Sequence, residues 1–393
     1  MTQNITHGQF QHGRISRRKR AVLPHLGNFF FGNIYKALTG NRRLPKALFK
    51  RAVANGIDRE QLEAVWRQVH DRDELAPLML AIAENRLQQA LYWHDVGVKN
   101  RARDNYLEAT FWEIYSSLLT TDATARQKSL ERAKASYALA APSFANPAHE
   151  IDIHYMGMEL KGYLRLPATA DDETTSIINT NHPCVILFNG ISTPKEEFYF
   201  TENSLLSLGI ATLSFDYPFT AEANSMVALE AEELGNSLLL ALSGRPEVDM
   251  SRLVAYGTSV GGRIALYIAA KYNQRFRAVA SISAPYDLLN DLDLLLPAMR
   301  REFAASQQCS KATVFDIARQ TPLRGELERI ETPALIVGGG KDIVAMPEET
   351  KTIYEQVGAS DKKLIICPGA SHNCYEMMPS LRHEIAQWIK QRL

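Results

Sequence analysis

Cysteine is scarce in this chain. Only four cysteines, Cys184, Cys309, Cys367 and Cys374, occur among its 393 residues. They are too few and too widely spaced for a framework of disulfides or for a close-spaced zinc site. We therefore expect free thiols, no bound metal, and a reducing compartment such as the cytoplasm.

An excess of charge of one sign is also lacking. The 44 lysines and arginines balance the 44 aspartates and glutamates, so the overall charge gives no reason to expect binding to nucleic acid or to an anionic membrane. No apolar run reaches the roughly 18 residues that suggest a membrane span. The local basic run Arg17–Arg20 is expected to be part of a loose, solvated arm, and a contact with phosphate or with a partner is the alternative.

Two different periodicities are present. From about Pro24 to Ala141 the apolar residues recur at helical spacing, which predicts packed helical hairpins. After Pro147 the period changes to two, and short apolar strands alternate with helices. This alternation predicts an α/β fold, with a doubly wound, mostly parallel sheet that carries its active residues at the carboxyl ends of its strands. We expect strands at residues 150–155, 159–166, 184–188, 211–215, 253–256, 278–282, 334–337 and 364–367.

The change of periodicity sets the expected domain boundaries. Residues 1–146 are predicted to form a helical amino-terminal cap domain, and residues 147–393 a catalytic domain. A leucine-rich helical interval at about 287–330 is expected to be a lid that helps the amino-terminal helices to cover the site. A homodimer formed through those helices is a further expectation. Trp93, Tyr106 and Trp112 are candidates for lining a substrate pocket, although core packing is the default for aromatic residues.

A Gly-x-Ser-x-Gly turn, from Gly257 to Gly261, joins an apolar strand to an apolar helix. In that setting the turn forces the serine backbone into a strained conformation, and the glycines avoid clashes where strand and helix pass closely. The pattern predicts Ser259 as a nucleophile held at the start of the helix, with the Val260 N–H as one oxyanion donor. A plain tight turn is the alternative.

An unassisted serine hydroxyl is a poor nucleophile, so a base and an orienting carboxylate are needed. Two later strands end in suitable residues: Asp342 follows the strand at 334–337, and His372 follows the strand at 364–367. His372 is expected to act as general base and then as general acid, while Asp342 holds its tautomer. Asp287, which follows the preceding strand, is the alternative acid.

The loop after the strand at 184–188 is expected to complete an oxyanion hole. Its sequence is Asn189-Gly190-Ile191-Ser192. Gly190 lets the backbone turn toward the serine, and the N–H of Ile191 is the predicted second donor. Asn189 is expected to contribute structurally or through its side chain, and an ordinary exit from the strand is the alternative for it.

These residues resemble the α/β-hydrolase fold, and three further segments point to one branch of it: Arg101–Ala109, Asn189–Glu197 with its Lys195-Glu196-Glu197 motif, and Phe215-Asp216-Tyr217-Pro218. Together they are similar to the branch that includes 2,6-dihydroxypseudooxynicotine hydrolase, the fungal polyketide-shortening hydrolases and the esterases related to the fermentation-respiration switch protein. The resemblance implies a serine hydrolase with a Ser-Asp-His triad and no cofactor. It also implies cleavage of an ester, or of a carbon-carbon bond next to a ketone.

The expected substrate is a small molecule, a medium-sized and partly aromatic or polyketide-like metabolite. An acyltransferase or cyclase that uses the same triad remains an alternative, because a substrate hydroxyl can replace water at the acyl-enzyme. A non-catalytic homologue that docks a protein partner on its helices is a second alternative. Nucleic-acid binding would depend only on the Arg17–Arg20 run.

Overall fold

The computed structural model describes residues 46–69, 74–120, 122–168, 181–191, 193–217, 230–289 and 318–393. The basic run Arg17–Arg20, Ser192, Cys309 and most of the expected lid, residues 290–317, lie outside these ranges. Within the described ranges, no helix combines the length and the apolar composition that crossing a membrane requires.

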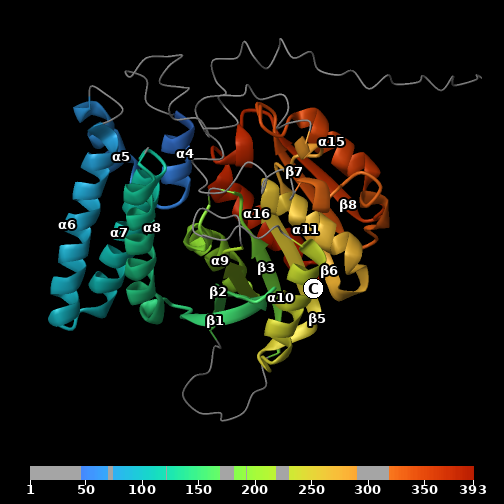
Figure 1. Cartoon of the computed structure of the whole chain (residues 1–393), viewed down its shortest axis with the longest axis horizontal. Coiled ribbons are helices and arrows are strands. Elements are labelled where there is room, and N and C mark those ends of the chain that lie inside the picture. Colours follow the sequence, from blue (N-terminus) through green and yellow to red (C-terminus); the bar gives the residue numbers. More distant parts are fainter. Residues whose placement is uncertain are drawn as a thin grey trace, which may run out of the picture.

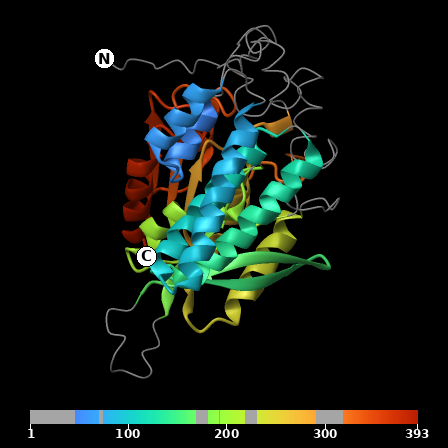
Figure 2. The ribbon, with the colours of Figure 1, turned by 90° about the vertical axis from the view of Figure 1, so that its left-hand side faces the viewer.

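Most of residues 46–140 are helical. Its helices are α4 (Lys46–Ala54), α5 (Arg59–Gln68), α6 (Leu75–Asp95), α7 (Lys99–Ser117) and α8 (Ala123–Ala140). The Asp58 carboxylate begins α5 by accepting the N–H of Gln61 at 2.9 Å, and Gly97, at a φ of +78°, lies in the turn from α6 to α7. Successive helices pack side by side, to the left of the sheet in Figure 1 and in front of it in Figure 2. The helical hairpins predicted over this part are confirmed.

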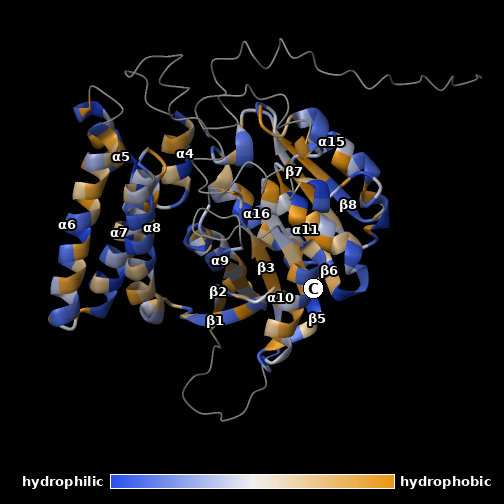
Figure 3. Ribbon diagram, in the orientation of Figure 1, coloured by the Kyte–Doolittle hydropathy of each residue, from blue (hydrophilic) through white to orange (hydrophobic). Residues whose placement is uncertain are grey.

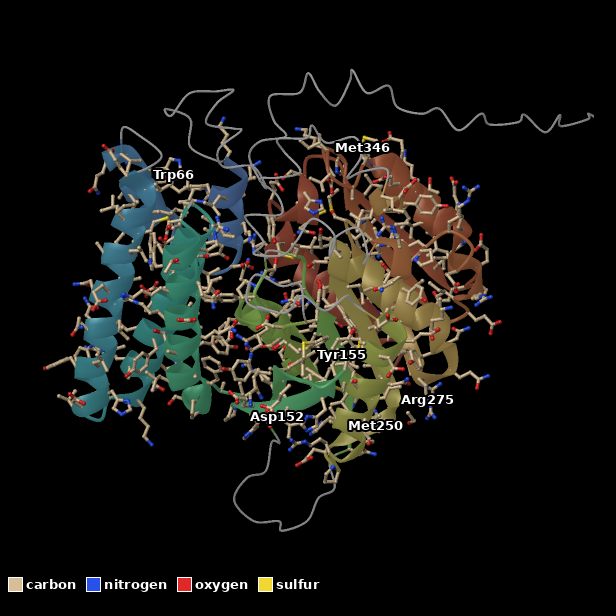
Figure 4. The ribbon with its side chains drawn as sticks, viewed as in Figure 1. Trp66, Asp152, Tyr155, Met250, Arg275 and Met346 are labelled. Atoms are coloured by element: carbon tan, nitrogen blue, oxygen red, sulfur yellow. The ribbon has the colours of Figure 1, made fainter. Side chains whose placement is uncertain are left out.

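Aromatic residues fill the space between these helices. Trp112 is buried in a cluster that joins α4 to α8, and Tyr106 is buried in a second cluster that also contains Tyr137 and Tyr163. Trp66 on α5, labelled in Figure 4, meets Phe49 of α4 edge to face with 5.2 Å between the ring centroids. The aromatic content of the helices therefore serves their packing against one another and against the first strands.

The second part of the chain forms one eight-stranded sheet, in the order β1-β2-β4-β3-β5-β6-β7-β8. The strands are β1 (Ala148–Tyr155), β2 (Met158–Arg165), β3 (His182–Phe188), β4 (Ala211–Phe215), β5 (Val248–Thr258), β6 (Phe276–Ile282), β7 (Ala334–Gly339) and β8 (Lys362–Cys367). The β1–β2 hairpin is antiparallel and also pairs antiparallel with β4, whereas the other pairs are parallel. The predicted doubly wound, mostly parallel sheet is confirmed.

Helices cover both faces of the sheet, which explains why its central strands are continuous apolar runs. In β3, Cys184, Ile186 and Phe188 face a core shared with α10 (Ala231–Ser243) and α11 (Val260–Lys271). The alternate residues Val185 and Leu187 face a core shared with α9 (Tyr199–Leu206) and α16 (Met378–Lys390). Figure 3 shows the hydrophobic strands between helices whose outer surfaces are hydrophilic. On the first face, the Tyr155 hydroxyl (labelled in Figure 4) accepts the N–H of Glu230 at 2.6 Å, next to the start of α10.

The parallel register brings several loops to one edge of the sheet. Phe188 pairs with Gly257, Thr258 pairs with Ile282, and Gly339 pairs with Cys367. The chain therefore leaves β3, β5, β6, β7 and β8 at the same end. This edge is where the predicted site residues meet.

Candidate active site

The turn between β5 and α11 has the strained geometry that the sequence predicts. Ser259 has a φ of +55° and a ψ of −127°, which is unusual for a residue with a side chain. A Cβ on Gly257 would lie 2.2 Å from the carbonyl oxygen of Gly261, and one on Gly261 would lie 2.1 Å from that of Phe188. Both positions therefore require glycine, and the close passage of strand and helix holds Ser259 at the start of α11.

Three predicted side chains from separate loops form a line of hydrogen bonds. Nε2 of His372 lies 2.9 Å from the Ser259 Oγ. Nδ1 of the same ring lies 2.9 Å from Oδ2 of Asp342. All three residues are buried. When Nδ1–H donates to the carboxylate, Nε2 is left as an acceptor for the serine hydroxyl proton.

The turn after β7 fixes the Asp342 carboxylate. Its Oδ1 accepts the N–H groups of Val344 at 2.8 Å and Ala345 at 3.0 Å, which leaves Oδ2 directed at His372. Asp287, the alternative acid, is exposed. The structure thus brings Asp342 to the imidazole.

The loop after β3 lies against the nucleophile. A Cβ on Gly190 would be 3.3 Å from the Ser259 Cβ, and Ile191 is buried nearby in the same loop. Val260 is the first residue of α11. Neither the N–H of Ile191 nor that of Val260 donates a hydrogen bond to another described residue. The side-chain amide of Asn189 donates to the Thr193 carbonyl and, at 3.3 Å, to Asp216, so this side chain braces the loop.

Buried charges hold the same loop from behind. The Lys195 Nζ lies 2.8 Å from the Asp216 carboxylate and 2.8 Å from that of Glu196. The Glu197 carboxylate accepts hydrogen bonds from both the Nε and the Nη2 of Arg51 in α4 and, at 2.8 Å, from Asn55, the residue that follows α4. The Lys195-Glu196-Glu197 motif therefore joins the sheet to the helical region.

Burial and a neighbouring negative charge shift the pKa of Arg51 in opposite directions. Burial alone would lower the pKa of the guanidinium, but the charge of Glu197 outweighs this effect and the pKa is raised. The Tyr115 hydroxyl also donates to Glu197, at 3.2 Å. Sequence reasoning did not find Arg51 or Asn55, because nothing in α4 marks a partner that lies more than 140 residues away.

The other reactive side chains and the aromatic residues are placed elsewhere. Cys184, Cys367 and Cys374 are free, as expected, and burial raises the pKa of the Cys184 thiol to about 12. In the described part of the chain, no three His, Cys, Asp or Glu side chains converge as metal ligands would. Tyr106 and Trp112 lie in the helical clusters, and Trp93 packs on the second of these with its ring under the Arg101 guanidinium.

Known proteins resemble this chain in sequence and in fold. The prolyl oligopeptidase family matches residues 238–393, a span that contains Ser259, Asp342 and His372. The chain is 26% identical over 317 residues to 2,6-dihydropseudooxynicotine hydrolase of Paenarthrobacter nicotinovorans, which covers 79% of this chain and 82% of that protein. It is 23% identical over 325 residues to esterase FrsA of Citrobacter koseri, which covers 78% and 75%. The crystal structure of the 2,6-dihydroxy-pseudo-oxynicotine hydrolase superposes with a TM-score of 0.76 at 23% identity, over 88% of this chain and 95% of the other.

The chain has the α/β-hydrolase fold. The resemblance that the sequence motifs indicate is confirmed, since the relatives include a hydrolase named for 2,6-dihydropseudooxynicotine and an esterase. The likeness in fold extends beyond the catalytic strands, because the superposition with the solved hydrolase covers 88% of this chain.

Proposed function

We propose that this α/β-hydrolase is a serine hydrolase in which Ser259, His372 and Asp342 act as a catalytic triad. Its substrate is a medium-sized, partly aromatic or polyketide-like metabolite, cut at an ester or at a carbon-carbon bond next to a ketone. The observation that carries the proposal is the line of two 2.9 Å contacts, from the serine hydroxyl through the imidazole to the carboxylate. This arrangement supplies the nucleophile with a base and supplies the base with its orienting group.

The first step of the proposed mechanism forms an acyl-enzyme. The Ser259 oxygen attacks the substrate carbonyl carbon while its proton moves to Nε2 of His372. The imidazolium that results is stabilised by Asp342 through Nδ1–H. Two backbone N–H groups fixed by the fold, at the start of α11 and in the loop after β3, suit donation to the oxyanion that develops. We assign them to Val260 and Ile191, and keep Gly190 and Asn189 as residues that shape the loop.

Collapse of the tetrahedral intermediate breaks the bond to the leaving group, which takes the proton from His372. With an ester the leaving atom is an oxygen. With a ketone it is a carbon, and its electron pair must be stabilised by a neighbouring carbonyl or aromatic ring. Water, activated by His372, then attacks the acyl-enzyme, restores Ser259 and releases a carboxylic acid.

The helical region is proposed to act as a cap domain, residues 1–146, on a catalytic domain, residues 147–393. The change from helices to strands between Ala140 and Ala148 supports this division. So does the contact of Arg51 and Asn55 with the loop after β3, which connects the helical region to the edge of the site. The lid at about 287–330 remains a prediction.

The names of the relatives support the substrate class but do not decide which bond is cut. One is a hydrolase named for 2,6-dihydropseudooxynicotine, and the other is an esterase. The name of the matching family makes a proline-containing peptide a third substrate to include in the test.

The test incubates the full chain with aryl esters, aryl 1,3-diketones and a proline-containing peptide amide in ¹⁸O-labelled water. We expect an acid product that carries ¹⁸O from the ester or the diketone series, and no product with the variant Ser259→Ala. An acyl group transferred to an added alcohol in place of water would instead indicate an acyltransferase. Absence of any turnover above that of Ser259→Ala would refute the proposal.

A further inference from the structure

The carboxyl end of β6 carries a hydroxyl that the mechanism above does not use. Ser283 directly follows this strand, and its side chain is 0% exposed. Its φ is +50°, a backbone conformation that residues with a Cβ rarely adopt. Such conformations persist where the surroundings impose them, and they cluster at functional sites.

This end of β6 contacts the backbone of Ser259, of the residue after His372, and of the strand that leads to Asp342. The Ser283 Oγ accepts the N–H of Asn373, the residue that follows His372, at 3.0 Å. The Ser283 N–H donates to the Val337 carbonyl in β7, the strand that leads to Asp342, at 2.8 Å. The carbonyl of the preceding residue, Ile282, accepts the N–H of Ser259, also at 2.8 Å. Two consecutive residues therefore contact the turn that carries Ser259, strand β7 and the loop that carries His372.

The loop that carries His372 depends on such outside support. Asn373 and Cys374, the two residues after the histidine, have φ values of +61° and +54°. Within the loop, the Cys374 N–H donates to the Ser371 carbonyl, which leaves the peptide between His372 and Asn373 to be held from elsewhere. The Ser283 hydroxyl is the acceptor that holds it.

We propose that Ser283 is a positioning residue for His372. Its hydroxyl fixes the peptide that follows the histidine, and so sets the distance and direction of the imidazole toward the Ser259 Oγ. Without that hydroxyl a buried N–H loses its acceptor, and a small shift of the loop relieves it. Displacement of a catalytic group by about 1 Å can cost on the order of 100-fold in rate. This inference rests on the proposed function, because it assigns a role relative to the general base.

The test compares Ser283→Gly and Ser283→Cys with the wild-type chain. Glycine removes the acceptor and also relieves the positive φ, so the variant is suited to fold. Cysteine keeps the shape but accepts weakly through sulfur. For an aryl ester we expect kcat to fall about 10-fold to 100-fold in Ser283→Gly, by less in Ser283→Cys, and KM to stay within about twofold.

A matched control lies two residues earlier, inside β6. Ser281 is also buried, and its hydroxyl has no hydrogen-bond partner among the described residues. Ser281→Ala should therefore leave kcat within about twofold of wild type.

Different results would contradict the positioning role of Ser283 and the proposed hydrolase function. An active wild type with an unchanged kcat in Ser283→Gly would overturn the positioning role alone, as would a kcat loss of the same size in Ser281→Ala. A wild type that is no more active than Ser259→Ala would remove the proposed function itself, and this inference with it.

Discussion

Two sets of buried contacts hold the loops of the site, and they are built differently. At the ends of β5 to β8, backbone and hydroxyl groups of neighbouring strands hold the triad, as in the contacts of Ile282 and Ser283. At the loop after β3, side-chain charges from distant helices provide the support, chiefly Arg51 of α4 paired with Glu197. The strand ends are thus fixed by the sheet itself, whereas the β3 loop depends on a helical region and on charges that need their partners.

Arg382 of α16 belongs to the second set. It donates to the carbonyl of Ala54 at 2.7 Å and to the Asn55 side chain, at the carboxyl end of α4, where a positive charge is favourable. It also reaches Thr201 at 3.1 Å. Burial lowers the pKa of its guanidinium, and the neighbouring tyrosines and Glu197 oppose that effect. One side chain therefore fastens α4 to the helix that follows the His372 loop.

The largest effect should come from the strand-end set, in Asp342→Asn. Asparagine can still accept the N–H groups of Val344 and Ala345, so the turn after β7 should be kept. The imidazole, however, loses the carboxylate that selects its tautomer, and kcat should fall by about 10⁴-fold. Steady-state kinetics with an aryl ester, together with thermal unfolding, measure the change. A kcat within about tenfold of wild type would contradict the role of Asp342.

The next largest effect is expected for Arg51→Met, which removes one of the side-chain charges that hold the loop after β3. Glu197 would stay buried without its cationic partner, and unfolding in urea should show a loss of about 3 kcal/mol. Because Asn55 and Tyr115 still donate to Glu197, the β3 loop should shift and not unfold, and kcat should fall by about 10-fold.

Two controls sharpen that comparison. The double variant Arg51→Met with Glu197→Gln removes both charges while the glutamine can still accept from Asn55 and Tyr115, and it should recover most of the lost stability. Arg59→Met breaks an exposed pair, with side chains 62% and 46% exposed, and should cost no more than about 0.5 kcal/mol. If Arg51→Met were as stable as Arg59→Met, the two sets of contacts would not differ as described.

The smallest expected effect lies inside the helical region, at Glu113. Burial raises the pKa of this carboxyl to about 7 from an ordinary 4.5, although Arg132 opposes the shift. The folded chain therefore keeps a proton that the unfolded chain releases above about pH 4.5. The stability linked to that proton is complete below this pH, is lost as the pH rises toward 7, and changes no further above it.

Glu113→Gln should remove this dependence. Between pH 5 and pH 7.5, thermal unfolding should show that the Tm of the wild type falls by about 2–4 °C more than that of the variant. Glu84 contacts the same arginine but its side chain is 47% exposed, and hydrogen bonds from Gln88 and Arg132 lower its pKa. Glu84→Gln should therefore show the same fall of Tm between pH 5 and pH 7.5 as the wild type. An equal decline in Glu113→Gln would contradict the assignment.

The difference between strand-end contacts and charges from distant helices explains how much of the site could be predicted from the sequence. Ser259, Asp342 and His372 each follow an apolar strand, so local pattern and chain order were enough to place them at one edge. Ser283 also follows a strand, but only its contact with Asn373 in the folded chain separates it from other strand-end serines. The pair of Arg51 and Glu197 carries no local signal, because it forms between residues 146 positions apart.

The exact bounds of the strands and the roles of the aromatic residues also could not be predicted from local sequence patterns. β5 begins at Val248, five residues before the predicted strand, because Val248 already pairs with His182 of β3; a register irregularity then spans the polar stretch until Leu253 pairs with Cys184. Helical periodicity could not separate pocket from core for Tyr106 and Trp112, since both uses place an aromatic residue on a helix face that packs inward.

The most direct test of the central claim is covalent labelling of the full chain with a fluorophosphonate, followed by mass spectrometry of its peptides. The account predicts one phosphonyl adduct, on Ser259, formed much more slowly in Asp342→Asn and absent in Ser259→Ala. An adduct on a different residue, or none at all in a preparation that hydrolyses esters, would contradict it.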